Sequence, residues 1–296
     1  MILPAFPMID LHTILPELFI CGAAFALLMA DLFIDAKRRS LIHFLAITVL
    51  VAAVLITVRD LAITTTTAFS GMFIRDLASD ILKISVYVVT ALSFIYAKPY
   101  LIERGLYKSE YYVLCLFAVL GMMLMISSGN LTVLYLGLEL VALSSYGLVG
   151  LDRDNPIASE AAMKYFVLGA IASGLLLYGM SMLYGSTGSL QLDTIYVAAT
   201  QTSSPYMFKL GVVFILAGIA FKLGAAPFHM WLPDVYQGAP TAVTAFISSA
   251  PKLAAFAMAY RLLESAAGVA ASDGVPMLAV IATLSLLLGN LMALVQ

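Results

Sequence analysis

Nine apolar stretches, each long enough to form a helix that crosses a bilayer, take up most of the 296-residue chain. A helix needs roughly 20 apolar residues to cross about 30 Å of hydrocarbon. Hydrophobic residues make up 62% of the chain and charged residues only 11%, whereas a soluble domain has roughly 25% charged residues. The sequence therefore predicts an all-α, polytopic transmembrane bundle in the lipid bilayer. Its helices are expected near 14–34, 41–58, 80–97, 111–128, 130–150, 158–184, 206–226, 241–263 and 275–294.

Basic residues in the loops predict the orientation of the chain. The odd-numbered loops hold seven: Lys37, Arg38, Arg39, Lys98, Arg104, Lys108 and Arg153. The even-numbered loops and their flanks hold four: Arg59, Arg75, Lys209 and Arg261. The N-terminus is therefore expected outside and Gln296 inside. Met1 begins no signal-peptide pattern, so the first helix is expected to stay, and the apolar end at Leu291–Gln296 suggests a chain cut from a longer one.

Two lysines and one glutamate lie near the middle of these apolar stretches, namely Glu139, Lys222 and Lys252. A charge at the bilayer centre costs about 2.5–3.5 kcal/mol on insertion scales, so such residues normally line a polar path. We interpret the three as proton carriers, because burial and nearby charges set how tightly each holds a proton. The alternatives are a static ion pair for Glu139 and a lysine that reaches an interface for Lys222.

Prolines beside both lysines predict interrupted helices. Pro227 and Pro233 follow Lys222, and Pro251 precedes Lys252. Each proline removes a backbone hydrogen bond, and broken helices at membrane depth mark ion sites in transporters. We expect the freed carbonyls at the end of the first half-helix to stabilise the Lys222 ammonium.

Further titratable residues allow both a functional and a structural interpretation. Lys164 extends the predicted proton path, or it pairs with Glu160 four residues earlier on the same helix. His229, in the broken region, is either a proton relay or a structural histidine.

Three charged residues beside a predicted helix start have a plainer interpretation. Lys83, Asp80 and Asp76 are expected to form a solvated cluster there. Asp31 is expected at the membrane interface. The interval 185–205, rich in Ser and Thr, is expected to be an exposed loop.

The chain offers no pattern for a cofactor of its own. Cys21 and Cys115 sit in apolar runs without metal spacing, and His12, His43 and His229 are too scattered for haem or metal ligands. The net charge of −2 predicts no nucleic-acid partner.

Long motifs resemble subunit N, an antiporter-like membrane subunit of bacterial NADH:quinone oxidoreductase, respiratory complex I. They are LYLGLELVALSSYGLVG, EAAMKYFVLGAIASGLLLYG, AFKLGAAPFHMWLPDVYQGAPTAVTAFISSAPKLAAF and LLLGNLMALVQ. The resemblance implies proton-path roles for Glu139, Lys164, Lys222 and Lys252. It also implies three N-terminal helices in 1–110, a first half-channel in 111–264, and the start of a second repeat in 265–296.

The same resemblance implies the setting of the chain. NADH, flavin, iron–sulfur clusters and quinone would be bound by partner subunits, and other membrane subunits of complex I, neighbouring antiporter-like subunits included, would surround the chain in the bacterial inner membrane. The alternatives are a subunit of a cation/proton antiporter or membrane-bound hydrogenase, a quinone-reducing enzyme, and a non-pumping scaffold. The missing redox ligands argue against the enzyme, and the midplane charges against the scaffold.

Overall fold

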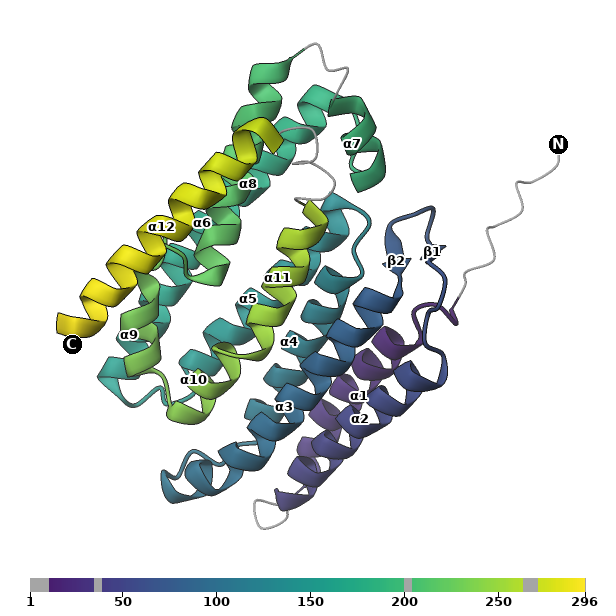
Figure 1. Cartoon of the computed structure of the whole chain (residues 1–296). Coiled ribbons are helices and arrows are strands. Elements are labelled where there is room, and N and C mark those ends of the chain that lie inside the picture. Colours follow the sequence, from purple (N-terminus) through teal and green to yellow (C-terminus); the bar gives the residue numbers. More distant parts are fainter. Residues whose placement is uncertain (1–10, 35–38, 200–203, 263–270, 296) are drawn as a thin grey trace.

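Helices account for nearly all of the fold, a bundle with one small β-hairpin at its edge (Figure 1). The computed structural model describes residues 11–34, 39–199, 204–262 and 271–295. The helices are α1 (Leu15–Asp31), α2 (Ser40–Arg59), α3 (Leu77–Glu103), α4 (Glu110–Ile126), α5 (Leu131–Val149), α6 (Pro156–Thr187), α7 (Leu192–Ala199), α8 (Pro205–Leu223), α9 (Trp231–Gly238), α10 (Thr241–Ile247), α11 (Ala250–Leu262) and α12 (Ala271–Val295). Strands β1 (Thr66–Ala68) and β2 (Phe73–Arg75) pair antiparallel.

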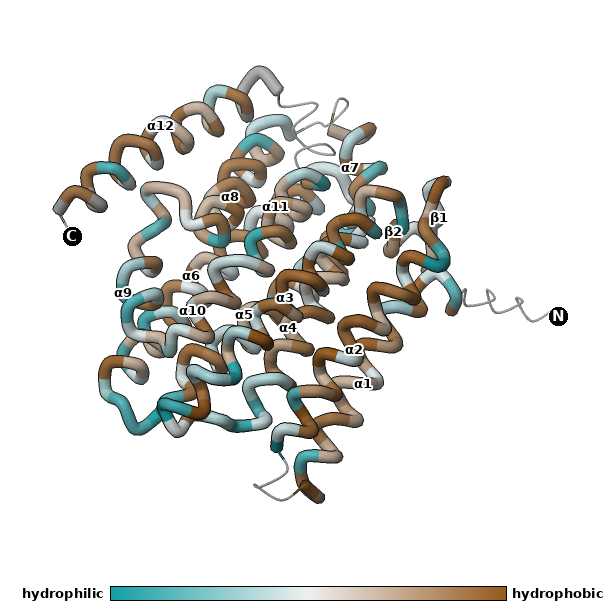
Figure 2. The backbone as a smooth tube through the Cα atoms, turned by 60° about the horizontal axis from the view of Figure 1, so that its bottom comes forward, coloured by the Kyte–Doolittle hydropathy of each residue, from teal (hydrophilic) through white to brown (hydrophobic). Residues whose placement is uncertain are grey.

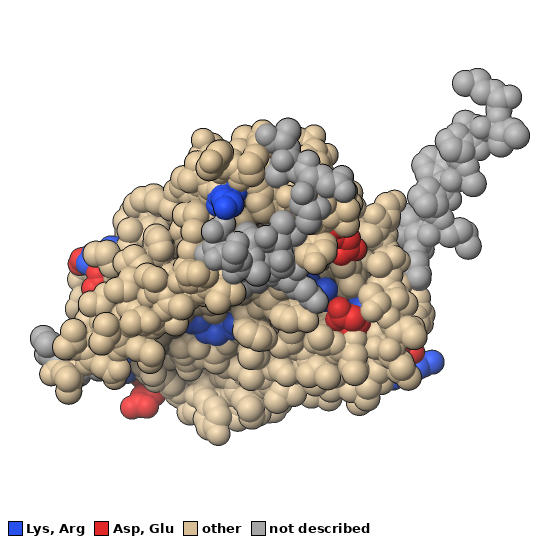
Figure 3. Space-filling view, turned by 45° about the horizontal axis from the view of Figure 1, so that its top comes forward, with Lys and Arg blue, Asp and Glu red and all other residues tan. Residues whose placement is uncertain are grey.

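Membrane-spanning length is reached by seven segments of the described chain, with α10 and α11 together forming one of them. Helices α1 and α4 have 17 residues each, at the lower end of the range of roughly 17–25 for a spanning helix. Apolar residues run along the helices, and polar residues gather in turns such as those around α9 and α10 (Figure 2). One face shows only a few separate charged patches (Figure 3). The predicted transmembrane bundle is confirmed.

Glycines allow two helix pairs to approach each other closely. A Cβ atom on Gly121 of α4 would lie 2.6 Å from the carbonyl oxygen of Gly137 on α5. A Cβ atom on Gly179 of α6 would lie 2.7 Å from the carbonyl oxygen of Gly211 on α8. Small residues at such crossings are typical of membrane helices, where close backbone packing drives association. The pairs α4–α5 and α6–α8 therefore form the centre of the bundle.

Both predicted interruptions occur, with different boundaries from those expected. Helix α8 ends at Leu223, and Gly224 follows in the left-handed region with a φ of 75°. Pro227 lies in the break itself, whereas Pro233 lies in the first turn of α9, where a missing N–H costs nothing. The expected helix at 241–263 is divided between Ile247 and Ala250, and Pro251 is the second residue of α11.

Two intervals differ from the sequence-based expectation. The predicted loop at 185–205 contains α7, whose residues Leu192, Ile195 and Ala199 are buried. Its apolar residues at helical spacing were too few to stand out from the surrounding Ser and Thr. The hairpin 66–75 fills the gap between α2 and α3. Lys37, Arg38 and Gln296, which entered the orientation argument, lie outside the described residues.

Candidate functional site

The break after α8 opens onto a cavity of about 30 Å³ inside the bundle. A water molecule needs roughly 10–15 Å³ of such space, so the cavity has room for two. Its lining comes from α4, α5, α6, α8, α9, α10 and α11: Met125, Leu138, Val141, Ala142, Tyr165, Lys222, Trp231, Ile247, Pro251, Lys252 and Ala255. The two lysines are the only charged residues in this lining, and each comes from a different helix.

Lys252 caps the broken helix. Its Nζ donates hydrogen bonds to the carbonyl oxygens of Lys222, at 3.0 Å, and Leu223, at 2.9 Å. These are the last carbonyls of α8, where the helix dipole favours a positive charge. The same ammonium lies 5.2 Å from the centre of the Trp231 ring, within cation–π range. Lys252 is therefore held by the end of one helix and the start of the next.

Lys222 lines the same cavity and has no carboxylate in direct contact, although the charge of Glu139 attracts its ammonium over a longer distance. Within the described chain, no Asp or Glu oxygen lies within 4.0 Å of its Nζ, and its nearest ring, Phe221, is centred 6.0 Å away. We expected the carbonyls at the end of α8 to stabilise Lys222. They bind the lysine of the neighbouring helix instead, because α11 brings Lys252 across the break.

Glu139 lies on α5 and is tied to α6. Ser173, which is 5% exposed, donates a hydrogen bond to Glu139 Oε1 and lies 3.2 Å from the Tyr135 hydroxyl. The carboxylate is partly buried and has no ion pair within the described residues. The structure thus gives Glu139 a hydroxyl partner and a longer-range attraction to the Lys222 ammonium. The contact ion pair that was the alternative does not form among the described residues.

Lys164 lies apart from the two cavity lysines. Its Nζ is 2.8 Å from both Glu160 and Asp234, and 43% of its side chain is exposed. These residues line a polar pocket of about 170 Å³ between α6 and α9. The pairing with Glu160 is the structural alternative considered for this lysine, and Asp234 adds a partner from the far side of the break.

His229 lies in the break but faces α12. Its Nε2 is 3.1 Å from the sulfur of Met292, and its Nδ1 is buried without a hydrogen-bond partner among the described residues. Neither ring nitrogen of His229 contacts Lys222 or Lys252 among the described residues.

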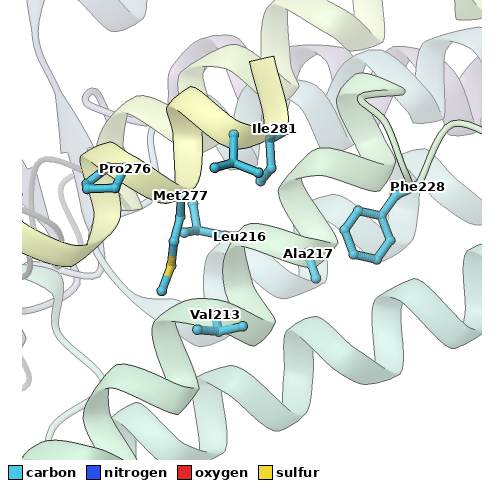
Figure 4. Close-up of a pocket in the computed structure, with 8 residues that line it drawn as sticks. Val213, Leu216, Ala217, Phe228, Pro276, Met277 and Ile281 are labelled. Carbon is cyan, nitrogen blue, oxygen red and sulfur yellow. The ribbon is translucent and has the colours of Figure 1, made fainter. Parts of the chain in front are cut away.

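An apolar pocket of about 340 Å³ separates α8 from α12 (Figure 4). Phe228, Met277 and Ile281 are among its lining residues, all of which are apolar. It offers no group that can bind a proton, so the candidate site is the smaller cavity beside it.

The assignment of Lys83, Asp80 and Asp76 to a solvated cluster is wrong. Lys83 and Asp80 are fully buried, and Lys83 Nζ lies 2.6 Å from Glu17 on α1. The hairpin folds over the start of α3, and the Phe73 ring lies 5.1 Å from the Lys83 ammonium. A carboxylate inside an apolar run, Glu17, was the available signal for a buried partner.

Asp76 links the start of α3 to the end of α11. It accepts hydrogen bonds from the backbone of Ser79, at 2.7 Å, and from Arg261, at 3.0 Å. Burial alone would raise the pKa of Asp76, but the charge of Arg261 and the bonds from Ser79 outweigh it and hold the pKa below its usual value. The carboxylate therefore stabilises the fold at pH values above the usual aspartate pKa, and this contribution is lost as the pH falls through the lower folded value.

We expect Asp76→Ala to lower the free energy of unfolding by about 1 kcal/mol or more, because it removes a helix cap together with the partner of Arg261. Asp76→Asn keeps an oxygen for the cap and should cost less. Thermal unfolding of the purified protein at neutral pH measures both. Asp193→Ala, at an exposed position on α7, is the control. Equal unfolding temperatures for Asp76→Ala and this control would contradict the assigned role.

The sequence matches a known protein family over the region that holds these residues. Residues 128–296, more than half of the chain, match the family described as "NADH:quinone oxidoreductase/Mrp antiporter, TM". The chain belongs to the NADH:quinone oxidoreductase/Mrp antiporter family. It is a multi-pass membrane protein, and the family match covers Glu139, Lys164, Lys222, His229 and Lys252.

Relatives in the NADH:quinone oxidoreductase/Mrp antiporter family include subunits N. The chain is 50% identical over 291 residues to NADH-quinone oxidoreductase subunit N of Thioalkalivibrio sulfidiphilus. The aligned segment covers 97% of this chain and 60% of that protein. It is 52% identical over 287 residues to the subunit N of Xanthomonas euvesicatoria, covering 97% and 59%. The resemblance to subunit N is confirmed. The chain spans about 60% of the length of these relatives.

Solved structures of the family share the fold. A chain of respiratory complex I from Thermus thermophilus superposes with a TM-score of 0.78 at 30% identity, covering 95% of this chain and 58% of that one. A chain of the Mrp complex from Dietzia gives a TM-score of 0.70 at 23% identity, covering 86% and 49%. The second similarity concerns the fold alone.

Proposed function

We propose that the chain is a proton-translocating membrane subunit of NADH:quinone oxidoreductase. Support comes from its similarity to proteins named subunit N and from the two lysines that share the cavity at the helix break. Protons would move along Glu139, Lys164, Lys222 and Lys252, driven by quinone reduction in other subunits. The observation that carries the proposal is the pair of lysines at one small cavity.

The geometry suggests how the two lysines would work together. Lys252 has two carbonyls and an aromatic ring to hold its charge, whereas Lys222 has no carboxylate in direct contact. Two ammonium ions across a cavity of about 30 Å³ repel each other, so a proton arriving at one favours the departure of a proton from the other. Water in the cavity would carry that proton.

Glu139 and Lys164 would supply the earlier part of the path. Glu139, with the Ser173 hydroxyl as a partner, can accept or release a proton without breaking an ion pair. Lys164 lies at a polar pocket together with Asp234, which gives water access to the start of α6. With the N-terminus outside, this pocket would face the cytoplasm. His229 would relay protons at the helix break itself, on the side that faces α12.

The setting of the subunit follows from the same proposal. NADH, flavin, iron–sulfur clusters and quinone would be bound by partner subunits, and the chain would sit in the bacterial inner membrane beside other antiporter-like subunits. Residues 111–264 would form a first half-channel, and 265–296 would begin a second repeat.

Glu139→Gln in the intact complex tests the proposal. The amide keeps the shape of the side chain but cannot cycle a proton, so pumping per NADH oxidised should fall at least about tenfold, since positioned proton carriers contribute typically 10²–10⁴-fold to a rate. Proton uptake by vesicles and the amount of assembled complex are measured together. Full pumping by a well-assembled Glu139→Gln complex would refute the role of the glutamate.

A further inference from the structure

Two buried ion pairs lie outside residues 128–296, the region that matches the family model. Glu17 on α1 and Lys83 on α3 are 2.6 Å apart, with 6% and 0% of their side chains exposed. Next to it, Arg75 and Asp80 pair at 3.0 Å, with 5% and 0% exposed. These charges lie near the helix starts, with Glu17 in the first turn of α1 and Asp80 in the first turn of α3, and they are buried in protein rather than exposed to water. Charged residues inside a membrane bundle are rare and usually have a function.

The polar atoms around Glu17 are not saturated by protein. Glu17 Oε2 and the Thr90 hydroxyl are buried and have no hydrogen-bond partner in the described chain. The Tyr87 hydroxyl is also buried, and it has only the Thr57 side chain as a hydrogen-bonding neighbour there. Lys83, Tyr87 and Thr90 are spaced to lie on one face of α3, about 10 Å from first to last. A polar strip therefore runs inward from the buried pair toward the middle of α3.

Unpaired buried polar atoms of this kind are normally satisfied by ordered water. A static ion pair is stable in an apolar interior only if further hydrogen bonds satisfy its remaining lone pairs and protons. Around Glu17 and Lys83 the protein provides few such bonds. The Tyr87 phenol interacts with the Thr57 hydroxyl and electrostatically with Glu17, Asp80 and Arg75. None of these contacts gives Glu17 Oε2 a hydrogen-bond donor, so a water molecule between Tyr87 and Glu17 would supply one.

We propose that Glu17, Lys83 and Tyr87 form a second proton-binding site, which holds ordered water among helices α1 to α3. A proton passes from the Lys83 ammonium to the Glu17 carboxylate, which leaves a neutral amine and a neutral acid, and it returns when the pair charges again. The Tyr87 hydroxyl orients the water that exchanges this proton with the surroundings. The inference rests on the proposed function, because the exchanged protons are those that the subunit moves.

The cluster also has a connection to the surface. Arg75 donates a hydrogen bond of 2.7 Å to the carbonyl oxygen of Asp60, and the Asp60 carboxylate lies 3.6 Å from His12, which is 71% exposed. The buried site is therefore continuous with charged groups at the end of the bundle that carries the hairpin.

Tyr87→Phe in the intact complex is the first test. The matched control is Tyr96→Phe, the same change on the same helix at a side chain that is 75% exposed. We expect Tyr87→Phe to lower proton pumping per NADH oxidised at least twofold and Tyr96→Phe to leave it unchanged. If the site were dry and static, removing the Tyr87 hydroxyl would cost only its contact with Thr57 and leave pumping unchanged, and that result would overturn the proposal.

The double variant Glu17→Gln with Lys83→Met is the second test, because it removes both charges and leaves no unpaired ion. Reduced pumping by an assembled complex supports the proposal, and wild-type pumping overturns it. If the double variant does not assemble, a high-resolution structure of the wild-type complex that shows ordered water tests the proposal instead. Water at hydrogen-bonding distance from Glu17 Oε2 and the Tyr87 hydroxyl is expected, and its absence overturns the proposal.

Glu139→Gln, assayed in parallel, separates the two hypotheses. If it lowers pumping while Tyr87→Phe does not, the second site alone is refuted. If it leaves pumping intact, the proposed function fails whatever the result for Tyr87.

Discussion

Lys252→Ala is expected to reduce coupled proton transport on the order of tenfold to a hundredfold. The change removes a proton carrier and also two charge-assisted hydrogen bonds to the last carbonyls of α8. Bonds to a charged group are each worth about 1.5–3 kcal/mol, and every 1.4 kcal/mol is roughly a factor of ten in an equilibrium. Losing one such bond therefore shifts the equilibrium position of the end of α8 at the cavity by roughly a factor of ten. Proton uptake by vesicles containing the intact complex measures the effect.

Lys252→Arg distinguishes capping from proton transfer. A guanidinium can still donate to the carbonyls of Lys222 and Leu223, but it does not lose its proton in a protein. We expect Lys252→Arg to restore the amount of assembled complex while pumping stays low. Recovery of pumping by the arginine variant would mean that Lys252 acts only as a helix cap.

Lys222→Met should have a comparable effect on transport with a smaller effect on assembly. Lys222 has no ion pair within 4.0 Å in the described chain, so methionine fills its space and removes only a longer-range attraction to Glu139. Positioned proton carriers contribute typically 10²–10⁴-fold to a rate, and we expect a loss on the order of a hundredfold in pumping. Lys222→Arg should not rescue it, for the reason given for Lys252. The measurement is again pumping per NADH oxidised.

Lys209→Met is the control for Lys222, since Lys209 is an exposed residue near the other end of the same helix. The variant removes one positive charge from α8 without touching the cavity. If Lys209→Met impairs pumping as much as Lys222→Met, the net charge of α8 matters and the cavity assignment is wrong.

Depth and proline position indicated Lys222 and Lys252, which the structure brings to one cavity, and Glu139, which lies outside its lining. Glu139, Lys222 and Lys252 stood out because a charge in the middle of an apolar run is costly, and Pro227 indicated the break. Which lysine binds the carbonyls at the end of α8 could not be predicted, because that depends on how α11 crosses α8. Helix packing of this kind is a tertiary property that single-helix patterns do not contain.

The buried charges near the hairpin were misassigned for a related reason. Lys83 is close to a predicted helix start, and charged residues at such positions usually face water or lipid head groups. The hairpin that covers this helix start has two strands of three residues each, too short to leave a clear alternating pattern. Its presence changes the surroundings of Lys83 and Asp80 from solvent to protein interior.

The two close glycine crossings determine which helices can move relative to each other. Gly121 with Gly137, and Gly179 with Gly211, bring α4 to α5 and α6 to α8 at backbone contact, so we expect each pair to move as a unit. The hydrogen bond from Ser173 to Glu139 joins α6 to α5, and hence one pair to the other. A proton that arrives at or leaves Glu139 therefore acts on the contact between the two pairs, where a local change in charge can become a change in helix arrangement.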